Sequence, residues 1–124
     1  MLAAVDAERG QVVGKVRLAA HPESFRVERS GPRIFVNVPS AAQVAVIDRE
    51  SMKVVATWPV TDAASNYPMA LDEPNHRLFI GCRRPAKVLV YHTATGKQAA
   101  AFDIVATPTT SSTRCELAVV RHRR

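Results

Sequence analysis

The chain has 124 residues, of which 47% are hydrophobic and 23% charged, an ordinary composition for a globular protein. No stretch approaches the roughly 20 apolar residues that a membrane helix needs, so we expect no membrane insertion. The formal net charge is +6, but basic and acidic residues are interspersed along most of the chain. A nucleic-acid-binding protein more often shows a basic stripe or face, so the charge pattern disfavours that class.

The N-terminus and the cysteines give little information about the compartment. Residues Met1–Asp6 contain neither a basic stretch nor an apolar core, so no signal peptide is visible. Cys82 and Cys115 lie in unlike contexts and fit neither a disulfide framework nor a metal-binding spacing. The location of the protein therefore stays open.

Short strands are predicted in chain order from runs of aliphatic, β-branched and aromatic residues. They are separated by turn formers such as Gly31-Pro32 and Pro74-Asn75, which argue against helices. The run Val44–Ile47 is continuously apolar, which fits a strand buried on both faces. The expected strands are 2–6, 11–18, 23–28, 33–38, 43–48, 53–60, 68–72, 77–82, 87–91 and 97–104.

A unit of about 43 residues repeats along the chain. Arg77–Ile80 follows Arg33–Val36 at a shift of 44 residues, and Val88–His92 follows Val44–Asp48 at the same shift. Repeats of roughly 40–50 residues made of short strands are typical of β-propeller blades. The sequence therefore predicts an all-β protein with propeller architecture.

The number of repeats predicts an incomplete β-propeller over residues 1–105. We expect two four-stranded antiparallel blades, residues 23–60 and 68–104, plus an N-terminal hairpin, residues 2–18. Closed propellers have about four to eight blades, so two and a half blades do not close a ring. An open blade face is hydrophobic and favours self-association.

The repeat stops after Ile104, and residues 106–124 are expected to form an irregular basic tail. Codons can be chosen for Thr107–Thr113 that, read with a one-base shift, encode a segment similar to the first strand of a further blade. We therefore hypothesise that the tail is a frameshifted continuation of a longer propeller gene. The nucleotide sequence of the gene tests this hypothesis.

Four short motifs characterise the repeat. They are Pro68–Ala70, Arg77–Ile80, Val44–Asp48 and Ser51–Val60. This set resembles the blades of the bacterial YVTN-repeat (surface-antigen-like) β-propellers over about residues 2–104. Phe35 and Phe79 replace the tyrosine of the family pattern, and His92 replaces its aspartate. The resemblance implies the fold and a parent family that is often exported, but no activity, because the motifs are structural.

The recurring blade residues have structural interpretations. We expect the Asp48 carboxylate to accept backbone N–H groups within its turn, and Gly96 to supply a positive φ in the equivalent turn. The aromatic residues at one blade position are expected to pack in the core, and two arginines to bond a neighbouring turn. These pairs are Trp58 with Phe102 and Arg33 with Arg77.

Motifs for catalysis, cofactors or metals are missing from the sequence. The histidines form no metal-binding spacing, and there is no nucleophile elbow, P-loop or dinucleotide fingerprint. We therefore predict no catalytic residue, no cofactor and no metal ligand. In a propeller, the loops that enter the innermost strands line one mouth of the central channel, here residues 21–25 and 63–67. The candidate ligand-contacting residues in these loops are His21, Glu23, Asn66 and Tyr67.

The sequence favours a non-enzymatic propeller fragment that serves as a scaffold or binding module for an unknown protein or small molecule. One alternative is a fragment of a lactonase-like, divalent-cation-dependent hydrolase, in which Glu23 and Asn66 would supply two of the oxygen ligands. The other alternative is nucleic-acid binding through the basic tail.

Overall fold

Described residues 2–61, 64–84 and 86–104 of the computed structural model form ten strands, all paired antiparallel. They make a two-stranded hairpin, β1–β2, and two four-stranded sheets with their strands in chain order. We call the sheet β3–β4–β5–β6 blade 1 and the sheet β7–β8–β9–β10 blade 2. The predicted fold class, an N-terminal hairpin followed by two antiparallel blades, is confirmed.

The strands of the hairpin are β1 (Leu2–Asp6) and β2 (Gln11–Val16). Those of blade 1 are β3 (Phe25–Val27), β4 (Arg33–Val38), β5 (Gln43–Asp48) and β6 (Lys53–Pro59), with a short 3₁₀ turn at Pro39–Ala41. Those of blade 2 are β7 (Ala64–Asp72), β8 (Arg77–Arg84), β9 (Ala86–His92) and β10 (Gln98–Asp103).

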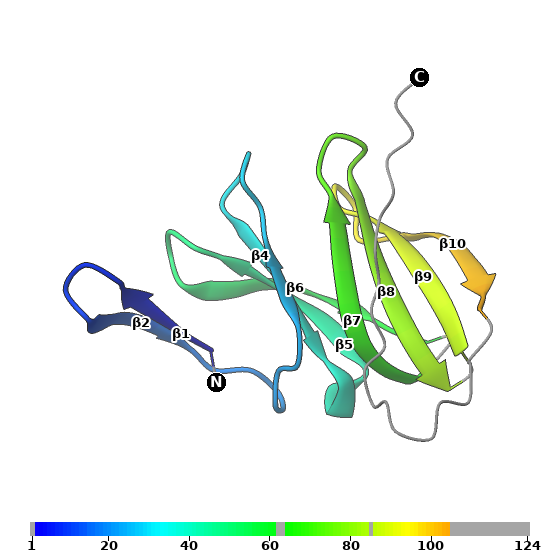
Figure 1. Ribbon diagram of the computed structural model, residues 1–124, viewed down its shortest axis with the longest axis horizontal. Helices are drawn as coiled ribbons and strands as arrows, with labels where there is room; N and C mark the ends of the chain where they lie inside the picture. The colour runs from blue at the N-terminus through cyan, green and yellow to red at the C-terminus, as the bar shows by residue number, and fades with distance from the viewer. Residues whose placement is uncertain (1, 62–63, 85, 105–124) are drawn as a thin grey trace.

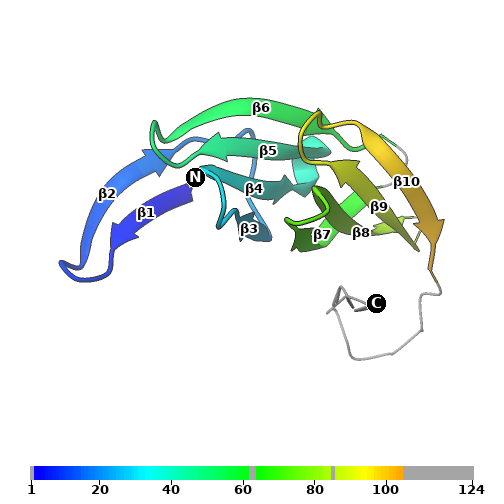
Figure 2. The same cartoon turned by 90° about the horizontal axis from the view of Figure 1, so that it is seen from above.

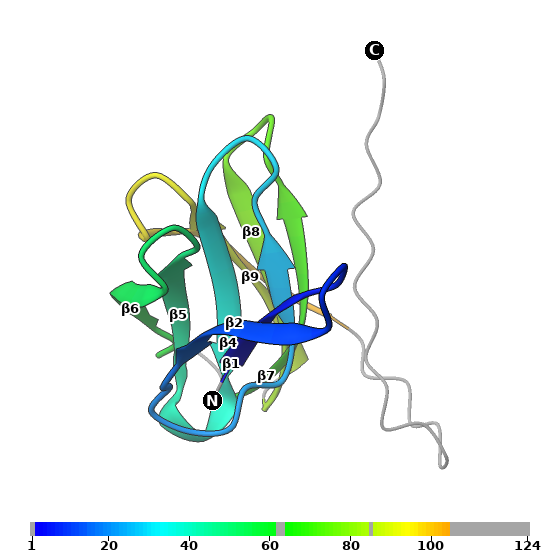
Figure 3. The ribbon, with the colours of Figure 1, turned by 90° about the vertical axis from the view of Figure 1, so that its left-hand side faces the viewer.

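The three sheets stand side by side in an open arc (Figure 1). Seen from above, β2, β6 and β10 lie along the convex side, while β3 and β7 lie toward the concave side (Figure 2). Seen from the hairpin's end, β1 and β2 lie in front of blade 1 (Figure 3). The hairpin and blade 2 therefore occupy opposite ends of the arc.

The outer hairpins β1–β2, β5–β6 and β9–β10 share one design. Each has the same register and a β-bulge at the same place in its ladder. A bulge bends a strand and increases its twist, so this feature gives each outer strand the same curvature. One set of equivalent pairs in the three ladders is Leu2 with Val16, Val44 with Trp58, and Val88 with Phe102.

The turns of these hairpins are equivalent as well. Each is closed by an N–H that donates to the carbonyl four residues earlier, and the donor has a positive φ: 63° at Gly10, 54° at Met52 and 73° at Gly96. The expected role of Gly96 is confirmed. The Asp48 carboxylate accepts the Glu50 N–H over 2.8 Å, as the sequence predicts.

Two hydrophobic cores hold the sheets together. The larger core lies between blade 1 and blade 2, and the smaller one between the hairpin and blade 1. Strands β4 and β5 contribute to both cores, because their alternate residues face opposite sides. In the smaller core Met52 packs over Gly14, and Val16 fills the position that Trp58 takes in the larger core.

Strand β7 begins at Ala64, earlier than the predicted residue 68. The expected loop 63–67 is therefore wrong for Asn66 and Tyr67, which belong to the strand. Pro68 lacks a backbone N–H, but a register shift between Asn66 and Met69 lets the ladder continue past it. Gly81 on the facing strand leaves room for the Pro68 ring, because a Cβ at this position would lie only 2.6 Å from the ring.

The predicted tail, residues 106–124, lies outside the described residues, and the division of the chain at residue 105 stays a prediction. Within the described ranges, no helix has the length and apolar character needed to cross a membrane.

Candidate functional site

Two of the four predicted channel-mouth residues, Glu23 and Asn66, bond Asn37 of β4. The Glu23 N–H donates to the Asn37 carbonyl, and the Asn66 Nδ2 donates to the Asn37 Oδ1, each over 3.0 Å. His21 and Glu23 are exposed, Asn66 is fully buried, and the Tyr67 side chain lies outside the described part of the chain. The structure thus brings Glu23 and Asn66 to a common neighbour. Ligand binding by the four residues stays a prediction.

Asn66 connects the first strand of blade 2 to blade 1. Its Nδ2 lies 3.0 Å from the Asn37 Oδ1 and 3.4 Å from the Gln43 carbonyl, and the Asn37 Nδ2 donates to the Ser24 Oγ over 3.2 Å. Hydrogen bonds between buried polar groups are short-ranged and directional, so this network fixes how the two blades meet.

Two shallow depressions lie at the opposite end of the blades, where the turns β3–β4, β5–β6 and β7–β8 come together. Their volumes are about 430 and 500 Å³. The sequence pattern did not point to this end. Arg29, Ser30, Gly31, Pro32, Arg49 and Glu50 line the first depression, and Arg29, Ser30, Glu73, Pro74 and His76 line the second.

Glu73 of the β7–β8 turn bonds the β3–β4 turn beneath these depressions. Its Oε1 accepts the Arg29 N–H over 2.7 Å, and both the N–H and the hydroxyl of Ser30 over 3.0 Å. The Ser30 N–H is the main reason that the pKa of the Glu73 carboxyl lies below its ordinary value, an effect that desolvation partly offsets. Glu73 therefore ties blade 2 to blade 1 as an ionised carboxylate.

Metal-ligating and nucleophilic side chains are sparse on the described surface. In the described ranges, no group of three or more His, Cys, Asp or Glu residues is placed to hold a metal ion. Cys82 is 1% exposed and lies in the core between the blades. Its predicted burial is confirmed.

An arginine of blade 1 holds a turn of blade 2. The Arg33 guanidinium donates to both carboxylate oxygens of Glu28, over 3.0 and 2.7 Å, and its Nη1 donates to the Thr93 carbonyl in the β9–β10 turn. It also lies 5.1 Å from the centre of the Phe35 ring. Glu28 is buried, and the bidentate pairing compensates its charge. The expectation that Arg33 bonds a neighbouring turn is confirmed.

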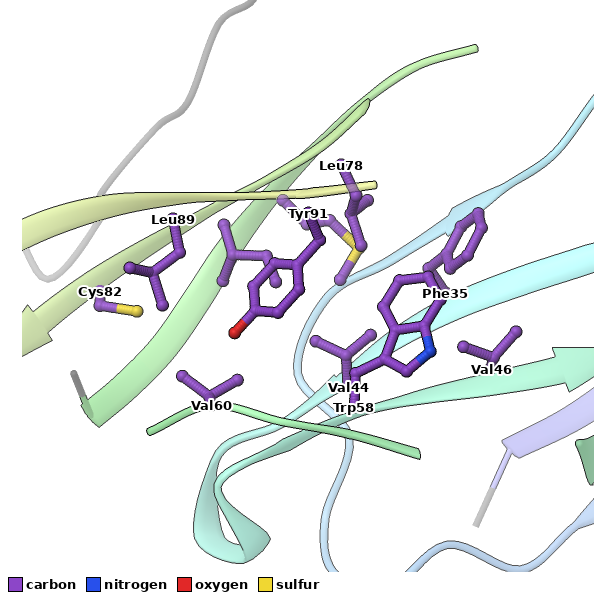
Figure 4. Close-up of a cluster of buried hydrophobic side chains, with 11 residues drawn as sticks. Phe35, Val44, Val46, Trp58, Val60, Leu78, Cys82, Leu89 and Tyr91 are labelled. Atoms are coloured by element: carbon purple, nitrogen blue, oxygen red, sulfur yellow. The ribbon is translucent and has the colours of Figure 1, made fainter. Parts of the chain in front are cut away.

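Aromatic rings fill the contact between the blades. Trp58 from β6 lies between Phe35 and Tyr91, with ring centroids 5.4 and 6.2 Å away (Figure 4). The Tyr91 hydroxyl donates to the Pro59 carbonyl over 3.2 Å. A Cβ at Gly96 would lie 2.2 Å from the Trp58 Nε1, so the β9–β10 turn rests directly on the indole. The blade contact is thus closely packed.

The outward face of blade 2 repeats the residues by which blade 1 binds blade 2. Trp58 is 8% exposed, whereas Phe102 at the equivalent position is 57% exposed. Packing is therefore confirmed for Trp58, but the prediction for Phe102 is wrong, because no described blade covers this side. We call this surface the blade 2 flank. Its residues and their blade 1 equivalents, each 44 positions earlier, are Arg77 for Arg33, Phe79 for Phe35, Val88 for Val44, and Phe102 for Trp58.

Arg77 on the blade 2 flank bonds its own blade. Its Nη1 donates to the carbonyls of Asn75, over 3.2 Å, and His76, over 3.4 Å, and lies 2.7 Å from the His92 Nδ1. Asp72 occupies the position that is equivalent to Glu28. Blade 2 therefore keeps an acid and an arginine at the positions of the Glu28–Arg33 pair, but Asp72 accepts the Asn75 Nδ2 over 2.8 Å.

Known structures with this arrangement are β-propellers. The chain is similar to the Kuenenia stuttgartiensis hydrazine synthase, with a TM-score of 0.72 and 19% identity over 80% of this chain and 28% of that one. It is also similar to the β-propeller domain of Myceliophteria thermophila Cps50 (Swd1), with a TM-score of 0.62 and 18% identity over 73% of this chain and 28% of that one. No protein-family model and no curated protein match the chain.

The strand order, the packing of the blades and these structural neighbours define the fold as a β-propeller. The described residues form two blades and the outer half of a third, in an open arc. The chain spans about 28% of the length of each neighbour.

Proposed function

We propose that the chain is a non-enzymatic β-propeller module of the YVTN-repeat type that serves as a scaffold or binding module. Its binding surface is the blade 2 flank. The observation that carries this proposal is the equivalence of Phe102, which is exposed, to Trp58, which is buried against the next blade. The support for the YVTN-repeat type is the set of blade motifs in the sequence.

The flank specifies the kind of partner. Phe102 is exposed and Phe79 and Val88 are half-buried, so together they offer an apolar surface, and Arg77 offers guanidinium donors at its edge. In the contact within the chain, the same positions receive an apolar sheet face that includes Tyr91 and a turn carbonyl, the Thr93 carbonyl. The partner is therefore a β blade with an apolar face and a tight hairpin turn. Its burial of the flank removes apolar area from water, which favours binding.

An extended chain tests the binding surface. A second copy of residues 61–104 is inserted after residue 104, so that the flank can receive a blade whose sequence matches blade 2. The reporter is Phe102→Cys in a background with Cys82→Ala and Cys115→Ala. We expect maleimide labelling of this cysteine to be at least tenfold slower in the extended chain than in the original chain.

The control is the extended chain with Arg77→Glu in the first copy of blade 2. This change places a carboxylate against the turn carbonyl, so we expect fast labelling to return. Equal labelling rates in the original and extended chains would contradict the proposal. Circular dichroism of each chain establishes that the strands are intact.

A further inference from the structure

We propose that the blade 2 flank binds a second copy of this chain through the outward face of its β1–β2 hairpin, so that two copies close head to tail. This inference rests on the proposed function, because it identifies the blade that the flank receives. The two surfaces lie at opposite ends of the arc (Figure 1). They are also different from one another, so the contact is heterologous.

The outward face of the hairpin repeats the face by which blade 2 packs on blade 1. Blade 2 uses Leu89 and Tyr91 of β9, which are fully or almost fully buried in the core between the blades. The shared register and bulge make Ala3 and Val5 of β1 their equivalents. Val5 is 58% exposed. An apolar side chain therefore stands uncovered at the position that Tyr91 uses for packing.

The hairpin turn also matches the turn that Arg33 holds. The Gly10 N–H donates to the Asp6 carbonyl over 2.7 Å, as the equivalent group of Gly96 does in the β9–β10 turn. The Ala7 carbonyl is therefore the equivalent of the Thr93 carbonyl, the acceptor that Arg77 of another copy requires. Glu8 follows it in this turn and adds an acidic group near the incoming guanidinium.

Gly10 supports this pairing independently. A Cβ at Gly96 would collide with the Trp58 ring, whereas a Cβ at Gly10 would meet no atom of the described residues within 4 Å. The space above Gly10 is thus open in the single chain. In the proposed contact Phe102 of the other copy fills it, as Trp58 fills the space above Gly96.

The number of blades fits a closed pair. The described residues of each copy supply two blades and one two-stranded hairpin, so two copies supply six blade positions, two of them occupied by hairpins, within the range of about four to eight at which propellers close. A ring of two copies uses both flanks of each chain and leaves neither apolar surface exposed. This closure favours a dimer over an open chain of copies.

Mixed cross-linking tests the proposal on full-length chains with Cys82→Ala and Cys115→Ala. One preparation carries Phe102→Cys and the other carries Gly10→Cys, and each is treated with a short bismaleimide alone and after mixing. We expect a cross-linked dimer only in the mixture, because the two positions meet only between different copies. Sedimentation of the cysteine-free chain should give twice the mass of one chain.

Several results would overturn the proposal. A monomer at all concentrations up to 100 μM contradicts self-association, and a cross-linked dimer of the Phe102→Cys chain alone shows flank packing against flank. A ladder of larger products contradicts closure. Arg77→Glu and Val5→Glu should each yield a folded monomer, and their mixture should form a heterodimer through the one intact contact. Monomers in that mixture also contradict the head-to-tail arrangement.

The extended chain separates this inference from the proposed function. Slow labelling of the extended chain together with a monomeric original chain would preserve the flank as a blade-binding surface and refute the second copy as its partner. Fast labelling of the extended chain would refute both.

Discussion

The indole of Trp58 in blade 1 stacks on the phenol ring of Tyr91 in blade 2, with centroids 6.2 Å apart and planes inclined by 14°. Between them these rings bridge the two blades, and the Tyr91 hydroxyl bonds the backbone beside the indole, at Pro59. Aromatic pairs of this kind contribute about 0.5–1.5 kcal/mol beyond the area that they bury. The stability of the arc therefore depends on this contact.

Truncation of the two equivalent aromatic residues should have very different effects. Trp58→Ala leaves a cavity in the core between the blades, so we expect it to lower the free energy of unfolding by about 3–5 kcal/mol. Phe102→Ala removes an exposed ring and should change it by about 0.5 kcal/mol or less. Urea unfolding of monomeric chains measures both values. Similar losses for the two variants would contradict the distinction between a covered and an open face.

Replacing Gly10 or Gly96 with alanine distinguishes the stability cost of backbone strain from the cost of disturbed packing. Gly10→Ala places a side chain at a positive φ in open space, which costs about 1 kcal/mol. Gly96→Ala adds a collision with the Trp58 ring, so we expect a total loss of about 3 kcal/mol. Thermal unfolding monitored by the fluorescence of Trp58 compares the variants. Equal losses would show that the β9–β10 turn does not rest on the indole.

Removing the two equivalent arginines, Arg33 and Arg77, should also lower the free energy of unfolding by different amounts. Arg33→Ala leaves the buried Glu28 carboxylate without its bidentate partner and the Thr93 carbonyl without its donor, so we expect a loss of about 3 kcal/mol. Arg77→Ala removes bonds within blade 2 that are partly solvated, and its loss should be about 1 kcal/mol or less. Unfolding at concentrations that keep the chain monomeric tests this order. A larger loss for Arg77→Ala would contradict it.

Glu73 should make stability depend on acid pH. Its pKa is lower in the folded chain than in the unfolded one, so its contribution is fully present above the ordinary carboxyl range. The contribution is lost as the pH falls through the depressed pKa of the folded state. Glu73→Gln should therefore lower Tm at pH 7, and the difference from the original chain should shrink toward pH 3.

Glu50→Gln is the matched control, because within the described ranges the Glu50 side chain makes no hydrogen bond to blade 2. We expect it to leave the pH dependence of Tm unchanged. A constant difference between Glu73→Gln and the original chain at all pH values would contradict the role of the Glu73 charge.

The fold could be predicted because its determinants recur. Arg33 and Arg77, or Val44 and Val88, lie 44 residues apart because each blade uses equivalent positions for its packing face. The same recurrence predicted that an arginine on the strand face would bond a neighbouring turn. The start of β7 was missed because Pro68 indicates a strand boundary, and only the facing Gly81 shows that the ladder can pass it.

The contacts between blades could be predicted less well. Glu73 bonds Ser30 across the blades, but its equivalent position in blade 1 is occupied by Arg29, so the repeat contains no signal for this bond. Asn66 was predicted as a loop residue that contacts ligand, yet it is buried against Asn37. Its burial depends on how two distant segments meet, which the local pattern does not contain.

The cysteine reactivity of two equivalent valines tests the central claim most directly. Val44 is fully buried against blade 2, whereas Val88 at the equivalent position on the blade 2 flank is half-buried. We would label Val44→Cys and Val88→Cys separately, in the background with Cys82→Ala and Cys115→Ala, at concentrations that keep the chain monomeric. The account predicts much faster labelling of the cysteine at position 88. Equal rates, or faster labelling at position 44, would contradict it.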